Sequence, residues 1–121
     1  MYKVNISDVP CRQRNGLTSY ILLQHKDNPG VNLSVTWVNI EKNSSQKPHS
    51  HSPEQSYIII QGQGNIFIGD EMAKVQEGDL VYIPSNITHY IQNTGDNCLI
   101  YISTATPSHN FTNMYDSGDL R

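Results

Sequence analysis

Turn residues break this 121-residue chain into short β-forming runs, and this alternation of runs and turns is the feature that most limits its fold. The runs are rich in Val, Ile, Leu and Tyr, and clusters of Gly, Asn, Asp and Pro separate them. No segment shows the periodicity of an amphipathic helix, and the chain has no internal repeat. Eight or more short strands at this spacing predict a single all-β domain, built as a sandwich or a barrel.

The chain is long enough for one modest core. The predicted strands are, in chain order, 2–6, 17–24, 31–40, 51–61, 65–68, 72–75, 80–83, 88–92 and 98–103. The clearest alternation falls in 31–40, where Val31, Leu33, Val35 and Trp37 share one side, as in a half-buried antiparallel strand. We expect the barrel domain to occupy residues 1–106. The polar residues 107–121 then form a tail that packs outside the barrel or is partly disordered.

Composition excludes several classes of protein. The formal net charge is -3 and basic residues are few, so nothing favours nucleic-acid binding. No run of apolar residues is long enough to span a membrane. The first residues lack an apolar signal core, so we expect a cytoplasmic protein. In that compartment Cys11 and Cys98 are expected to be free thiols.

Three of the five histidines lie in two stretches, residues 48–62 and 78–93, at the spacing of metal ligands. On an extended segment His49 and His51 point to one face and can chelate a single ion. Gln55 shares their parity, and His89 arrives from a distant strand. Three neutral imidazoles and one oxygen suit a divalent transition metal such as Mn, Fe, Ni or Zn, with open positions for a substrate. A barrel with inward-pointing ligands fits this placement.

The two stretches resemble the two motifs of the cupin superfamily. The first motif, at 49–62, is matched by His49, His51, Gln55 and Gly62, and the second, at 78–93, by Gly78, Pro84, His89 and Asn93. The resemblance implies a small single-domain cupin, an antiparallel β-barrel or jelly roll with one divalent metal. It also implies a homodimer formed through the N-terminal strands, and open sheet edges favour the same pairing.

The resemblance makes one position unusual, because the motif's usual Glu ligand is replaced by Gln55. An amide offers a neutral carbonyl oxygen only, so a bound ion would keep its full charge and be a stronger Lewis acid. On an unbroken strand the neighbouring Glu54 points to the opposite face, although a bulge at Pro53 would reverse this. Glu54 therefore stays open as an alternative ligand, and Glu54 and Tyr57 are the candidate proton-transfer residues.

Trp37, Phe67 and Tyr101 are the large side chains that we expect to line a substrate pocket beside Tyr57. The fold alone does not give the reaction. One hypothesis is an enzyme that uses the metal as a Lewis acid to isomerise, tautomerise or cleave by elimination a small oxygen-rich substrate such as a sugar acid. A second is a dioxygenase with Fe, Mn or Ni on the same residues. A third is a non-catalytic protein that binds a small ligand or a metal.

Overall fold

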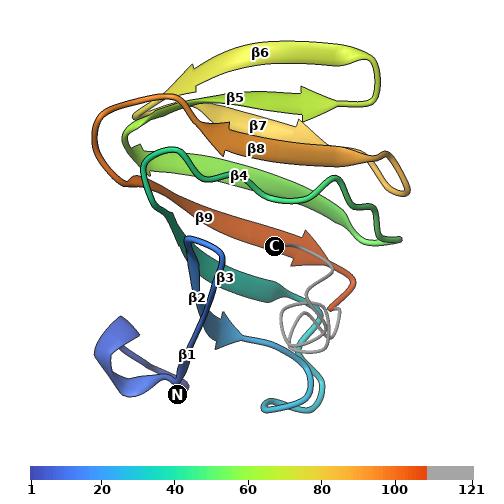
Figure 1. Ribbon diagram of the computed structural model, residues 1–121. Helices are drawn as coiled ribbons and strands as arrows, with labels where there is room; N and C mark the ends of the chain where they lie inside the picture. The colour runs from blue at the N-terminus through green and yellow to red at the C-terminus, as the bar shows by residue number, and fades with distance from the viewer. Residues whose placement is uncertain (109–121) are drawn as a thin grey trace.

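A computed structural model describes residues 1–108, and within them two antiparallel β-sheets face each other as a jelly roll (Figure 1). The predicted all-β fold is therefore confirmed. One short 3-10 helix, Ile6–Asp8, precedes the strands. None of the helical structure in residues 1–108 has the length or apolarity that a membrane crossing requires. The predicted tail lies almost wholly outside the described residues.

The larger sheet has six strands in the order β1-β2-β3-β9-β4-β7. Their bounds are Cys11–Arg14 for β1, Leu17–Leu23 for β2, Ser34–Ile40 for β3, Leu99–Thr106 for β9, Glu54–Gln61 for β4 and Leu80–Ile83 for β7. The smaller sheet has the order β6-β5-β8, with bounds Glu71–Gln76 for β6, Gln63–Ile68 for β5 and His89–Asn93 for β8. The chain between β3 and β4 runs beside β8, where Ser45 bridges to Gln92 and His49 to His89.

Apolar side chains from both sheets fill the space between them. Along β9 every second residue from Leu99 is buried, and β4 buries Gln55, Tyr57 and Ile59 in the same way. This alternation follows from the two-residue period of a strand, which sends successive side chains to opposite faces. The buried core is contributed by Leu17, Ile21, Val38, Ile40, Tyr57, Ile59, Ile66, Val75, Ile83, Ile91, Leu99, Tyr101 and Ala105.

Strand β3 buries the opposite face from the one that its apolar residues suggest. Ser34, Thr36, Val38 and Ile40 are buried, whereas Val35 and Trp37 keep contact with solvent. Thr36 lies opposite Ser103, another buried polar residue, on β9, whereas Val38 and Ile40 of the same strand join the apolar core. Periodicity separates the two faces of a strand, but it does not say which of them meets the core.

The N-terminal prediction is also wrong. No strand forms at residues 2–6; Asn5 instead caps the 3-10 helix, accepting a hydrogen bond from the Ser7 backbone. The first strand is β1, which pairs with β2 through the turn Asn15-Gly16. Both turn residues have positive φ, 50° and 83°, as a two-residue hairpin turn requires.

Candidate metal centre

His49, His51 and His89 come together between the two sheets. The stretch between β3 and β4 supplies the first two and β8 supplies the third. His49 and His89 exchange backbone hydrogen bonds of 2.9 and 3.1 Å, which fixes their relative position. The three available ligand atoms all lie within 4.8 Å of one another. The spacing in the sequence thus brings the three predicted metal ligands into one cluster.

The turn before β8 ties the two motifs together. Asn86 donates its backbone N–H to the carbonyl of His51 at 2.8 Å. Its φ is 63°, a left-handed conformation that Asn tolerates better than most residues. Asn86 therefore adopts a backbone shape that is most common for Gly.

Each imidazole in the cluster is oriented by a backbone carbonyl. The Nδ1 atoms of His49, His51 and His89 lie 2.7, 3.0 and 2.8 Å from the carbonyl oxygens of nearby residues in the chain. A neutral imidazole has one N–H, and a bond to a carbonyl places it on Nδ1. The lone pair of each ring is then on Nε2, the arrangement found in metal-bound histidines.

Burial keeps the rings of His49 and His89 neutral. It lowers the pKa of His49 to about 3, helped by repulsion from His89. It lowers the pKa of His89 to about 4. The Nε2 atom of His89 is buried and has no hydrogen-bond partner among the described residues. An unpaired buried nitrogen is costly in a protein, and a cation between the three rings would satisfy it.

Gln55 stands beside the cluster as a fourth polar group. Its Oε1 lies 3.0 Å from His51 Nε2, and its Nε2 donates to Ser103 Oγ at 3.0 Å. His51 thus has an oxygen acceptor beside each ring nitrogen but only one N–H when neutral. A cation next to Nε2 and Oε1 would satisfy both atoms, so the residues present fit a bound metal. Glu54, in contrast, is exposed and lies on the other face of β4.

Behind the cluster lies a buried set of hydrogen-bonded side chains. The rings of Tyr57 and Tyr101 stack with centroids 4.1 Å apart. Gln46 donates its amide to both hydroxyls and accepts a bond from the backbone of Ile91. Burial raises the pKa of Tyr57, so its phenol stays protonated at neutral pH. The centroid of Tyr57 is 6.4 Å from that of His89.

Two predicted substrate-binding residues do not join this cluster. Trp37 lies on the outer face of the larger sheet, where its Nε1 donates to Asn39 Oδ1 at 2.8 Å. Phe67 stacks on Tyr90 with centroids 4.4 Å apart, on the outer face of the smaller sheet. Of the three, only Tyr101 faces the interior beside Tyr57.

Sequence reasoning missed Gln46 and Ser103. No sequence pattern indicates that Gln46 is buried, because it lies in a polar stretch that is typical of a loop. In the structure only 3% of its surface is exposed. Ser103 shares the parity of Tyr101 on β9, which would have placed it inside.

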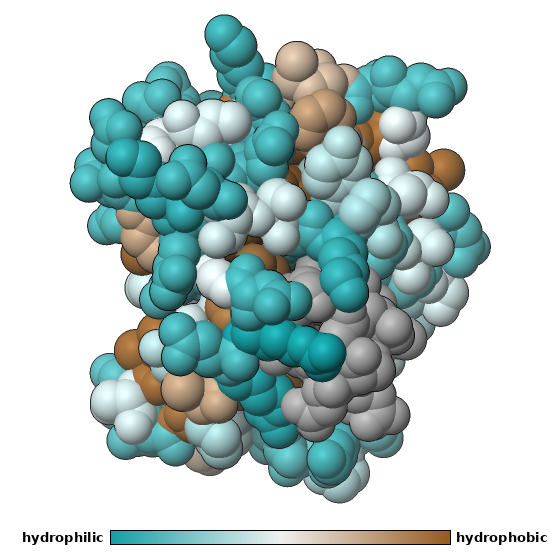
Figure 2. All heavy atoms as spheres, in the orientation of Figure 1, coloured by the Kyte–Doolittle hydropathy of each residue, from teal (hydrophilic) through white to brown (hydrophobic). Residues whose placement is uncertain are grey.

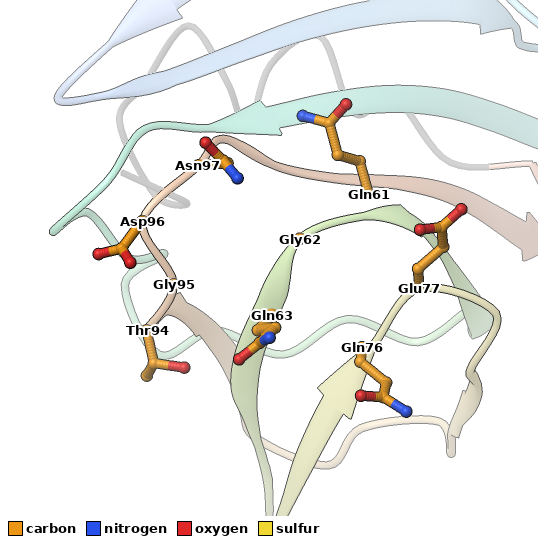
Figure 3. Close-up of a pocket in the computed structure, with 9 residues that line it drawn as sticks. All are labelled: Gln61, Gly62, Gln63, Gln76, Glu77, Thr94, Gly95, Asp96 and Asn97. Atoms are coloured by element: carbon orange, nitrogen blue, oxygen red, sulfur yellow. The ribbon is translucent and has the colours of Figure 1, made fainter.

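A surface hollow of about 640 Å³ lies at the other end of the molecule from the histidines, among the turns that follow β4, β6 and β8 (Figure 3). Its lining is polar and includes Glu77 and Asp96 but no histidine or cysteine. The side chains drawn in Figure 3 point in different directions and do not converge on one point. The histidine cluster, not this hollow, is the candidate site.

Comparison with known proteins agrees with the geometry. A family model described as the cupin domain matches residues 36–105, more than half of the chain. The chain belongs to the cupin family. The cupin is 30% identical over 90 residues to the uncharacterized protein MJ1618 of Methanocaldococcus jannaschii, a match that covers 72% of each chain.

Two solved structures share its fold. A variant of oxalate decarboxylase from B. subtilis superposes with a TM-score of 0.81 at 22% identity, over 91% of this chain and 30% of the other. The polyketide cyclase RemF from Streptomyces resistomycificus gives a TM-score of 0.76 at 20% identity, over 91% and 82% of the two chains. At these identities the likeness concerns the fold alone.

Proposed function

We propose that this cupin is an enzyme that uses a divalent metal ion as a Lewis acid on a small, oxygen-rich acid. One observation carries the proposal: three imidazoles are held by their Nδ1 atoms so that their Nε2 atoms face inward, and the Nε2 of His89 is left unpaired. A histidine cluster that served only to stabilise the fold would use its ring nitrogens in hydrogen bonds.

His49, His51 and His89 would hold the ion, with Gln55 as the fourth ligand. When bound, the ion would polarise a carbonyl or carboxylate oxygen of the substrate. All four ligands are neutral, so the ion's charge is not offset by the protein. Ser103 fixes the Gln55 amide with its carbonyl toward the rings.

The lack of buried carboxylates among the described residues favours an anionic substrate. The buried polar side chains of residues 1–108 are Ser19, Gln24, Ser34, Thr36, Gln46, His51, Gln55, His89, Asn93 and Ser103, and none carries a carboxylate. A substrate acid would therefore meet no buried negative charge among the described residues. The fold neighbour named oxalate decarboxylase supports a small acid as the class of substrate.

The absence of buried carboxylates among the described residues also bears on proton transfer. Isomerisation, tautomerisation and elimination each move a proton from a carbon beside the polarised group. Glu54 is exposed and on the other face of its strand. Tyr57 is held as a neutral phenol, since burial raises its pKa, so it can donate a hydrogen bond but is a poor base. We therefore assign the proton transfer to solvent admitted to the site. Tyr57 would then line the site without taking the proton.

Hydrogen exchange into the substrate tests this proposal without knowledge of the product. Metal-loaded protein is incubated in D₂O, without oxygen, with a panel of keto acids and sugar acids, and deuterium incorporation is followed by NMR. We expect exchange at the carbon next to the carbonyl of at least one acid, and its loss in His89→Ala. Turnover that requires oxygen would instead indicate a dioxygenase. Neither exchange nor turnover, with tight ligand binding, would indicate a non-catalytic cupin.

A further inference from the structure

The stretch that carries His49 and His51 runs beside β8 with one residue too many (Figure 1). Ser45 bridges to Gln92, and His49 bridges to His89. Along this stretch four steps separate the two bridged residues, whereas along β8 only three steps separate their partners. The left-over residue forms a β-bulge just before the first histidine of the cluster.

Gln46 lies in this bulge and closes it with its side chain. Its backbone N–H donates to the carbonyl of Ile91 at 3.0 Å. In a regular antiparallel pair the N–H of Ile91 would return the bond to the backbone carbonyl of Gln46. Here it donates to Gln46 Oε1 instead, at 3.2 Å. The side-chain amide thus takes the place of a backbone group of its own residue.

The bulge lets the backbone hold the ring of His49. The carbonyl oxygen of Lys47, the residue after Gln46, lies 2.7 Å from His49 Nδ1. Carbonyls of a regular strand point sideways to the neighbouring strands, not to a side chain of their own strand. The contact with Lys47 keeps the ring hydrogen on Nδ1 and leaves Nε2 for a ligand.

The other end of the Gln46 amide is held by the two stacked tyrosines of the larger sheet. Gln46 Nε2 donates to the hydroxyls of Tyr57 and Tyr101. The N–H of Ile91 can only donate, so it requires the amide oxygen on its own side. The amide therefore has one orientation in which each of these groups is matched.

We propose that Gln46 is a positioning residue for the metal centre. It holds the bulge that turns the Lys47 carbonyl to His49, and so keeps His49 Nε2 available to an ion. Gln46 is not itself a ligand, because its oxygen is bonded to Ile91. The inference rests on the proposed function only where it concerns the ion, since the tautomer of His49 belongs to the metal-free protein.

Nitrogen NMR of isotope-labelled histidine rings in the metal-free protein tests the proposal, because it reports which ring nitrogen carries the hydrogen. The unchanged protein at neutral pH should show His49 as a single Nδ1–H tautomer. Gln46→Met keeps a side chain of similar length but removes the acceptor for Ile91, so His49 should become a mixture of both tautomers. Gln46→Glu keeps an oxygen beside Ile91, and the tyrosine hydroxyls can turn to donate to the other oxygen. This variant should keep the single tautomer.

Asn93→Leu is the matched control. Asn93 is a buried amide at the far end of β8 from His89, and its side chain bonds three backbone groups outside the bulge. The variant loses buried hydrogen bonds of the same kind, so His49 should stay a single tautomer. If Gln46→Met does not fold, Gln46→Asn takes its place, since its amide is one methylene shorter.

Metal affinity separates this proposal from the proposed function. Gln46→Met should bind a divalent ion about 10–100-fold more weakly than Asn93→Leu, in competition with a chelator. If the unchanged protein binds no ion, the proposed function fails, and the tautomer of His49 alone decides the role of Gln46. A single Nδ1–H tautomer in Gln46→Met, or the same mixture in Asn93→Leu, would overturn the proposal.

Discussion

Ser103 sets the direction of the Gln55 amide, and its removal should weaken metal binding. Ser103 Oγ is the hydrogen-bond acceptor for Gln55 Nε2 at 3.0 Å, and the two side chains are 4% and 5% exposed. Ser103→Ala leaves a buried amide N–H without its partner, at a cost of about 1–3 kcal/mol. The amide can then rotate its carbonyl away from His51.

The expected loss of metal affinity is about 10–100-fold, the usual effect of removing a group that orients a ligand. That range equals about 1.4–2.7 kcal/mol, which agrees with the cost of the lost hydrogen bond. Competition of the metal-free protein with a chromophoric chelator measures it. Ser103→Thr keeps the hydroxyl and should recover most of the affinity.

Ser19→Ala is the matched control, because Ser19 is buried in the same sheet and its Oγ has no hydrogen-bond partner in the described part of the chain. It makes the same chemical change without touching Gln55, so metal affinity should stay at the level of the unchanged protein. Equal affinities for the Ser103→Ala and Ser19→Ala variants would refute the role given to Ser103 and would weaken the case for Gln55 as a ligand.

Three further outcomes follow from the same structure. Gln55→Glu adds a negative charge at the ion and should slow metal loss to a chelator; unchanged or faster loss would mean that Gln55 is not a ligand. Burial lowers the pKa of His49 to about 3 and of His89 to about 4, from 6.5. At pH values below 6.5 and above these lowered pKa values, the unfolded chain binds more protons than the folded one. The metal-free protein should therefore lose stability from pH 7 to pH 5. The loss is up to about 2 kcal/mol per histidine, and a melting temperature that does not fall would contradict it. Gly62 and Gly78 have φ of 92° and 94°, but only at Gly62 would a Cβ meet backbone, at 2.8 Å. Gly62→Ala should therefore lower the free energy of unfolding more than Gly78→Ala, and equal losses would exclude a clash.

The three histidines could be predicted because strand parity and turn positions are local properties of the sequence. His49 and His51 are two residues apart, and one register, with His49 opposite His89, completes the cluster. Gln46 could not be found in this way, and strand parity places Ser103 inside without showing that it contacts Gln55. Their importance comes from what lies across the barrel from them, and no local pattern records that.

The face of β3 shows the same limit. Its apolar residues mark one side of the strand, and the natural expectation is that this side is buried. Here Ser34 and Thr36 turn inward, Thr36 opposite the buried Ser103, while Val35 and Trp37 turn outward. The part of the molecular surface drawn in Figure 2 is mainly hydrophilic, with its hydrophobic side chains in separate small groups.

The metal content of the protein tests the central claim most directly. Elemental analysis of the purified chain, and of the chain reloaded with Mn, Fe, Ni or Zn and then dialysed, should find one divalent ion per chain. His89→Ala, which removes the unpaired Nε2, should retain almost none while keeping its β-sheet circular dichroism. An unchanged protein that holds no ion under any of these conditions, or a His89→Ala protein that holds as much as the unchanged one, would contradict the assignment of the histidine cluster as a metal centre.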